Sequence, residues 1–117
     1  MRGDLKQIII PHTVTDIKPG GVWCPNLETI EVASENTNYK SVNGNLYSKD
    51  GTKLVSYAIG KNETTFSIPD TVEIIENWAF FLNELTDITI PNSVTTIGEN
   101  AFFRDGTLEK VYYTGSK

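Results

Sequence analysis

The sequence has few of the residues that build metal and thiol sites. Cys24 and His12 are the single cysteine and the single histidine among 117 residues, which excludes an internal disulfide and a zinc centre of several Cys and His ligands. No window approaches 18 consecutive apolar residues, and Met1–Leu5 lacks a basic region followed by an apolar run. The chain as given therefore predicts neither membrane insertion nor an export signal of its own.

Basic residues are also in the minority. Ten Lys and Arg residues against fifteen Asp and Glu residues give a net charge of -5, the wrong sign for a surface that neutralises phosphates, so nucleic acid and anionic membranes are unfavourable partners. Apolar residues make up 38% of the chain and glycine adds nine more residues, which is typical of a folded protein. The length predicts one domain over residues 1–117.

A repeat of about 22 residues organises the chain. Residues 90–102, IPNSVTTIGENAF, lie over residues 68–80, IPDTVEIIENWAF, with Pro, Val, Ile, Ala and Phe in register. A further copy begins at Ile10 but has Gly21 and Val22 in place of the Ala-Phe pair. A fixed period of this length is typical of a solenoid, in which stacked coils share one core.

Each coil is expected to begin with a short strand, because the pattern Leu-x-x-Ile-x-Ile alternates β-branched residues on one buried face. We expect one parallel ladder of five strands at residues 5–10, 27–32, 63–68, 85–90 and 108–113. Proline ends each strand, the Val-x-x-Ile segment forms a second wall, and the Ala-Phe pair fills the core. Burial of large rings suggests that four residues dominate stability: Trp78, Phe80, Phe102 and Phe103.

One coil is 14 residues longer than the others. Its segment Leu46–Tyr57 predicts a β-hairpin with a type I′ turn at Asp50-Gly51, which pairs Tyr47 with Leu54 and Leu46 with Val55. Residues 34–38 are expected to be loop, followed by two apolar anchors, Tyr39 and Val42. The predicted coils are residues 5–26, 27–62 with the insert at 45–57, 63–84, 85–107 and a partial coil at 108–117.

These residues carry a family resemblance. The phrase Ile-Pro-x-x-Val-x-x-Ile-x-x-x-Ala-Phe, followed by Leu-x-x-Ile-x-Ile, resembles the treponemal, or BspA-like, leucine-rich repeat, and residues 46–54 resemble its hairpin insert. The resemblance implies a mainly β or α+β solenoid, wound as a right-handed superhelix. It also implies an extracellular or cell-surface protein that adheres to a host protein or to other cells. Uncapped terminal coils suggest a piece of a longer protein and pairing of copies through the ends.

The usual catalytic, metal and cofactor sites are not predicted. His12 occupies the turn slot of Asp70 and Asn92 in sibling repeats, so it is interpreted as an exposed turn residue, and Cys24 aligns with Leu82 as a small buried residue. Arg2-Gly3-Asp4 matches a triplet that integrin-class receptors recognise, but its place before a strand favours an ordinary turn. Asn62-Glu63-Thr64 matches the N-glycosylation sequon, but in a bacterial protein this asparagine would stay unmodified.

The outward strand positions are the candidate binding face. They form two columns, in which Ile9 and Tyr112 are the expected anchors. The candidate residues are Gln7, Ile9, Thr29, Glu31, Thr65, Ser67, Asp87, Thr89, Lys110 and Tyr112.

The sequence therefore favours a noncatalytic protein-binding module. A structural spacer stays open as an alternative, as does a carbohydrate-binding unit that uses Tyr47, Tyr57, Tyr112 and Tyr113 if they point outward together. The hairpin tip at residues 49–53 is a second candidate contact, because its two lysines suit an acidic partner.

Overall fold

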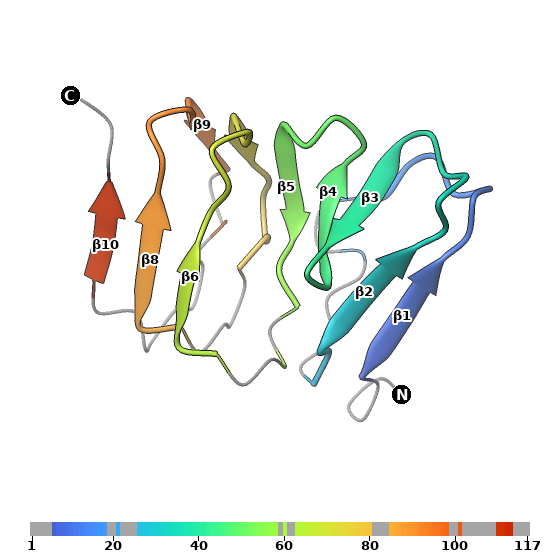
Figure 1. Ribbon diagram of the computed structural model, residues 1–117, viewed down its shortest axis with the longest axis horizontal. Helices are drawn as coiled ribbons and strands as arrows, with labels where there is room; N and C mark the ends of the chain where they lie inside the picture. Colours follow the sequence, from blue (N-terminus) through green and yellow to red (C-terminus); the bar gives the residue numbers. More distant parts are fainter. Residues whose placement is uncertain are drawn as a thin grey trace.

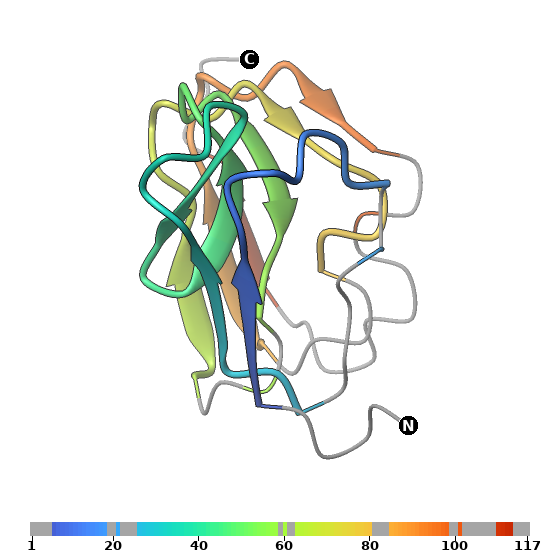
Figure 2. The ribbon, with the colours of Figure 1, turned by 90° about the vertical axis from the view of Figure 1, so that its right-hand side faces the viewer.

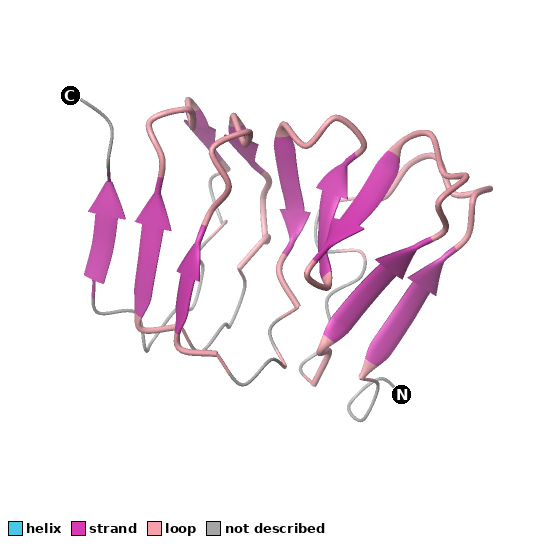
Figure 3. Cartoon of the chain, viewed as in Figure 1, coloured by secondary structure: helices cyan, strands magenta, loops and turns pink. Residues whose placement is uncertain are grey.

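The chain folds into stacked coils of β-structure. The structure, a computed structural model, describes residues 6–18, 21, 26–58, 60, 63–80, 85–98, 101 and 110–113. These residues form strands and connecting turns without a helix (Figure 3). The strands are β1 (Gln7–Ile10), β2 (Thr29–Val32), β3 (Tyr39–Val42), β4 (Asn45–Ser48), β5 (Lys53–Ser56), β6 (Thr65–Ser67), β7 (Ile74–Ile75), β8 (Asp87–Ile90), β9 (Thr96–Ile97) and β10 (Lys110–Tyr113).

The first wall of the solenoid consists of the predicted parallel strands. β1 pairs with β2, so that Ile8 lies opposite Ile30, and β8 pairs in parallel with β6 and with β10. The five strand positions expected from the repeat are thus confirmed. The expectation of a single five-stranded ladder is wrong, because β1-β2 and β6-β8-β10 are separate sheets (Figure 1).

The inserted segment separates the two sheets, because it forms an antiparallel meander of β3, β4 and β5 instead of a simple hairpin. β3 turns into β4 through Asn43 and Gly44, whose φ angles of 53° and 83° are both positive, as a type I′ turn requires. The next turn, at Asp50-Gly51, is not the predicted type I′. Gly51 has a φ of 80° but Asp50 does not have a positive φ, and the amide of Gly51 donates to the carbonyl of Ser48 at 2.9 Å.

A register shift between β4 and β5 makes their pairing differ from the predicted one. Tyr47 lies opposite Leu54 as expected, but Leu46 lies opposite Ser56 and not Val55. A β-bulge places an extra residue in one strand and re-aims its neighbours. Consequently the consecutive residues Leu54 and Val55 are both buried, in two different core clusters.

The second wall is the parallel ladder that runs from β5 through β7 to β9. Lys53, Ile74 and Thr96 lie in one row, and Leu54 and Ile75 are paired in the next row. The Val-x-x-Ile segments at residues 72–75 and 94–97 therefore form the expected wall opposite the β6-β8-β10 sheet (Figure 2). The inserted strand β5 supplies the corresponding strand for the long coil.

The core between the walls divides into two clusters. The larger one surrounds Phe80, which is fully buried, with ring centroids 5.3 Å from Tyr57 and 6.0 Å from Phe66. Burial of Phe80 confirms the expectation, whereas Trp78 is only half-buried; Phe102 and Phe103 lie outside the described residues. The smaller cluster holds six buried residues, which are Ile10, Leu27, Ile30, Leu46, Val55 and Ala58.

A buried asparagine replaces the repeat's valine in the long coil. Val14, Val72 and Val94 each donate a backbone hydrogen bond to the carbonyl of the proline three residues earlier, and Asn36 donates in the same way to Ala33. The conserved spacing then places Tyr39 in the isoleucine slot, where it packs against the smaller cluster. Tyr39 is thus an anchor as expected, but Val42 is exposed beside the Asn43-Gly44 turn, so its predicted anchoring role is wrong.

The last strand differs from its predicted burial. Val111 and Tyr113 were expected to face the core, but each is 51% exposed. Within the described residues β10 pairs with β8 alone, whereas Ile88 and Ile90 lie on β8, which has a strand on each side. Stacking on both sides, and not the alternating pattern alone, determines burial in a solenoid.

Candidate functional site

The predicted binding face is split between the two sheets of the first wall. On β1 and β2, Gln7 pairs with Thr29 and Ile9 pairs with Glu31; these four residues are called the β1–β2 face. The second set is called the β6–β10 face and contains two rows, Thr65-Asp87-Lys110 and Ser67-Thr89-Tyr112.

The two anchors belong to different faces. Ile9 is 66% exposed on β1 and Tyr112 is 48% exposed on β10, and these strands lie at opposite ends of the 40 Å long axis (Figure 1). The meander β3-β4-β5 lies between the two sheets along that axis. The predicted columns are therefore two patches, and a small ligand cannot contact both anchors. The side chain of Lys110 lies outside the described residues.

The remaining candidates from the sequence fall into two groups. His12 is exposed in a turn, as expected, while Arg2-Gly3-Asp4, Cys24 and Asn62 lie outside the described residues. At the hairpin tip the Asp50 carboxylate accepts hydrogen bonds from the amide and hydroxyl of Thr52 and from the hydroxyl of Ser48. These bonds lower the pKa of Asp50 to about 2. Asp50 thus stabilises the turn itself.

The tyrosines do not form a sugar-binding platform. Tyr47 and Tyr57 are almost fully buried. Burial raises the pKa of Tyr47 to about 12, and burial together with a 2.8 Å hydrogen bond to Glu63 raises the pKa of Tyr57 further. Tyr112 and Tyr113 are neighbours on one strand, so their side chains point to opposite faces. A carbohydrate-binding unit would need these four tyrosines to point outward together, and they do not.

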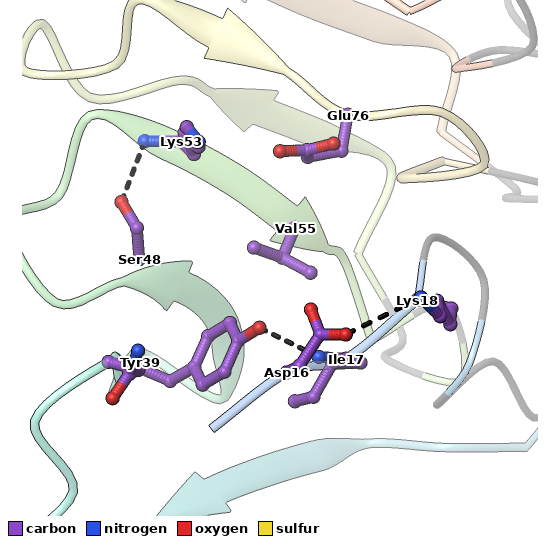
Figure 4. A pocket seen from close by; sticks show the side chains of 9 residues that line it. Asp16, Ile17, Lys18, Tyr39, Ser48, Lys53, Val55 and Glu76 are labelled. Atoms are coloured by element: carbon purple, nitrogen blue, oxygen red, sulfur yellow. Dashed lines mark hydrogen bonds and ion pairs between the residues drawn. The ribbon is translucent and has the colours of Figure 1, made fainter. Parts of the chain in front are cut away.

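A pocket that the sequence did not predict opens in the second wall. It has a volume of about 400 Å³, and it lies where the parallel ladder of the second wall ends at β5 (Figure 4). We call it the second-wall pocket, and it is lined by Asp16, Ile17, Lys18, Asn38, Tyr39, Ser48, Lys53, Val55 and Glu76.

The inserted meander produces this pocket. In a regular solenoid the first coil would continue the second-wall ladder beside the next coil, but here the amide of Ile17 donates to the phenol oxygen of Tyr39 at 2.8 Å. The side chain of Tyr39 thus occupies the place of a strand partner for the first coil. The first coil does not pair with β5, and the pocket lies between them. Val55, which is buried, and the half-buried Ile17 and Tyr39 form the apolar part of the lining.

Four charged residues surround that apolar part. Asp16 and Lys18 form an ion pair of 3.5 Å, and both side chains are largely exposed. Glu76 directly follows β7, in the coil after the long one, and is half-buried. Lys53 is exposed on β5. Within the described part of the chain neither the Glu76 carboxylate nor the Lys53 ammonium forms a hydrogen bond or ion pair. Figure 4 shows Val55 between Glu76 on one side and Asp16 and Ile17 on the other.

The residues that the structure describes include no cluster of three or more His, Cys, Asp or Glu side chains that could hold a metal ion. They also include no helix of the length and hydrophobicity needed to cross a membrane.

Comparison with known proteins identifies the repeat. Residues 52–116, more than half of the chain, match the model described as BspA type leucine-rich repeat region. The chain belongs to the BspA-type leucine-rich repeat family. Its repeats and the solenoid of stacked coils of about 22 residues are those expected from the sequence. Of the expected mainly β or α+β classes, the described residues show the first, with strands and no helix. Proteins of this repeat family are generally noncatalytic. A search of curated proteins gives no significant match.

Three solved structures share the fold and cover 94–95% of this chain. The pneumococcal vaccine antigen PcpA is 25% identical with a TM-score of 0.88. A leucine-rich repeat protein from Eubacterium ventriosum is 33% identical with a TM-score of 0.74, and a leucine-rich cell surface protein from Faecalibacterium prausnitzii is 30% identical with a TM-score of 0.81. The chain spans 28%, 37% and 30% of these structures, respectively.

Proposed function

We propose that this repeat domain is a noncatalytic protein-binding module of a bacterial surface or secreted protein. Two of the similar structures are described as a vaccine antigen and as a cell surface protein, which supports an extracellular location. The proposed partner is a host extracellular protein or another cell-surface protein.

The β6–β10 face carries the proposal. Its strands pair in strict register, so Ser67, Thr89 and Tyr112 form one row across three coils. Tyr112 offers an amphipathic ring that is 48% exposed, and such rings supply much of the energy at protein interfaces. The small hydroxyl side chains beside it can form hydrogen bonds at low cost in conformational entropy. The arrangement suits a flat protein surface better than a small molecule.

Binding to immobilised fibronectin, fibrinogen and mucin tests the proposal. We expect saturable binding to one of these proteins, weakened about tenfold by Tyr112→Ala, because truncating an exposed aromatic anchor costs about 1–2 kcal/mol. Ile9→Ser, on the separate β1–β2 face, is the matched control and should leave the affinity unchanged. Circular dichroism of each variant verifies that it is folded.

Two outcomes would contradict the proposal. A structural spacer would show no saturable binding to any extracellular protein. Equal affinities of the wild type and Tyr112→Ala would exclude the β6–β10 face as the contact surface. Sedimentation of the same samples measures any pairing of copies through the exposed strand β10.

A further inference from the structure

We propose that the second-wall pocket receives a cationic side chain, preferably that of an arginine, from the partner protein. The inference rests on the proposed function, since it requires that the partner is a protein. It adds a second contact on the wall opposite the β6–β10 face and assigns the chemistry of the residue that enters.

The shape of the pocket suits a long side chain with a polar tip. A volume of about 400 Å³ exceeds that of one arginine side chain and leaves room for its flanking backbone. Val55 and Ile17 present methyl groups along which the aliphatic stem can pack. Tyr39 contributes an aromatic ring, which attracts a guanidinium group electrostatically when the group lies over its face.

The carboxylates determine the sign of the ligand charge. Glu76 is half-buried and lacks a partner among the described residues, so it has lost hydration without gaining a cation. Asp16 faces the same pocket, and its ion pair with Lys18 is exposed and therefore easily exchanged. A planar guanidinium can donate to two carboxylates at once, which a lysine ammonium does with less geometric fit.

Two cations, Lys18 and Lys53, oppose this ligand. Both side chains are exposed, so water and salt screen their repulsion of an incoming cation. Lys18 is also paired with Asp16. A bound acidic side chain would use Lys53 and leave Glu76 facing a like charge. The net charge of -5 also attracts basic partners over longer distances. A cationic ligand is thus favoured over an anionic one.

Nuclear magnetic resonance of the full ¹⁵N-labelled chain tests the inference. The probe is the peptide acetyl-Gly-Gly-Arg-Gly-Gly-amide, and the comparison peptides carry lysine, citrulline or glutamate in place of arginine. We expect saturable shifts of the amide signals of Ile17, Tyr39 and Val55 with the arginine peptide. Citrulline has nearly the same shape without the charge, and its peptide should bind at least about fivefold more weakly.

Charge variants separate the two signs of ligand. Glu76→Gln should weaken the arginine peptide about fivefold, and Lys53→Gln should strengthen it about twofold. Glu73→Gln is the matched control, because Glu73 is exposed on the same coil and does not line the pocket; it should leave the affinity unchanged. Each variant's spectrum also shows whether the fold is intact.

Three results would overturn the inference: equal binding of the arginine and citrulline peptides, stronger binding of the glutamate peptide, or no saturable shift at the pocket. Each leaves the effect of Tyr112→Ala on whole-protein binding untouched. Loss of that effect, with arginine binding in the pocket retained, would instead contradict the proposed β6–β10 contact surface. The two proposals therefore fail separately.

Discussion

Replacement of Asn36 tests how the long coil is held to its neighbour. The side-chain amide donates to the carbonyls of Pro11 and Val14 at 3.0 and 2.9 Å, and its oxygen accepts from the amides of Asn38 and Tyr39 at 2.8 and 2.9 Å. Asn36 thus connects the turn of one coil to the start of β3 in the next. It also positions Asn38 and Tyr39, two residues of the second-wall pocket.

The expected cost follows from these four hydrogen bonds. A typical bond contributes about 0.5–1.5 kcal/mol net, so their sum is about 2–6 kcal/mol. Water can reach the exposed Pro11 turn and replace part of the loss, which places Asn36→Ala near 2–4 kcal/mol. The whole domain is expected to have a free energy of unfolding of about 5–15 kcal/mol, so this change should be plainly visible.

Urea denaturation followed by circular dichroism measures the change. Asn92→Ala is the matched control, since Asn92 lies exposed in a sibling turn, and it should change the free energy of unfolding by less than about 0.5 kcal/mol. Asn36→Val separates packing from hydrogen bonding, because sibling coils hold Val72 and Val94 in this slot. The valine variant should lose about as much stability as the alanine variant; if it matches the wild type, apolar packing and not hydrogen bonding determines this position.

Three further predictions concern the core, the buried tyrosines and the turn. Phe80→Ala should cost about 3–5 kcal/mol in urea denaturation and Phe66→Ala distinctly less, because only Phe80 is fully buried; a loss below 1 kcal/mol for Phe80→Ala would contradict its burial. The folded-state pKa values of Tyr47 and Tyr57 are raised above the usual value near 10. The stability that these two protonated tyrosines add to the folded state is therefore complete below pH 10 and is lost as the pH rises towards 12. The part of the tyrosinate absorbance that comes from Tyr47 and Tyr57, two of the five tyrosines, should therefore rise only when circular dichroism reports unfolding; ionisation of all five tyrosines in the folded chain at pH 11 would refute this. Gly44→Ala should cost about 1–2 kcal/mol by the same denaturation assay, because φ is 83° there, and an unchanged midpoint would exclude backbone strain.

The regular coils could be predicted because strand alternation, the strand end and the core ring each correspond to a residue type at a fixed position of the repeat. Ile88 and Ile90 alternate on one face, and Pro91 ends the strand, so both the strand and its boundary are local features. The burial of Phe80 follows from its recurrence at the repeat period. Burial of Val111 and Tyr113 does not follow in this way, because it depends on a coil stacked beyond β10 and not on the local pattern.

The meander was harder to predict, since two dipeptides compete for the same hairpin signal. Asn43-Gly44 and Asp50-Gly51 both suit a tight turn, and only the first adopts positive φ at both positions. The choice depends on long-range contacts, such as the hydrogen bond from the Ile30 amide to the Gly44 carbonyl at 2.8 Å. The bulge between β4 and β5 likewise depends on long-range packing, because Leu54 lies in the larger core cluster and Val55 in the smaller one.

The pocket follows from this same choice of turn. Once Asn43-Gly44 sets the register of β3 and β4, Tyr39 comes to the position where its phenol accepts the amide of Ile17. That bond holds the first coil beside the meander without extending the ladder, and the gap that results brings Asp16 and Glu76, 60 residues apart in sequence, to one pocket. No local motif marks such a pair. The useful signal is the insertion itself, because an irregular coil in a solenoid interrupts the backbone pairing of its walls and so exposes side chains that a regular coil would cover.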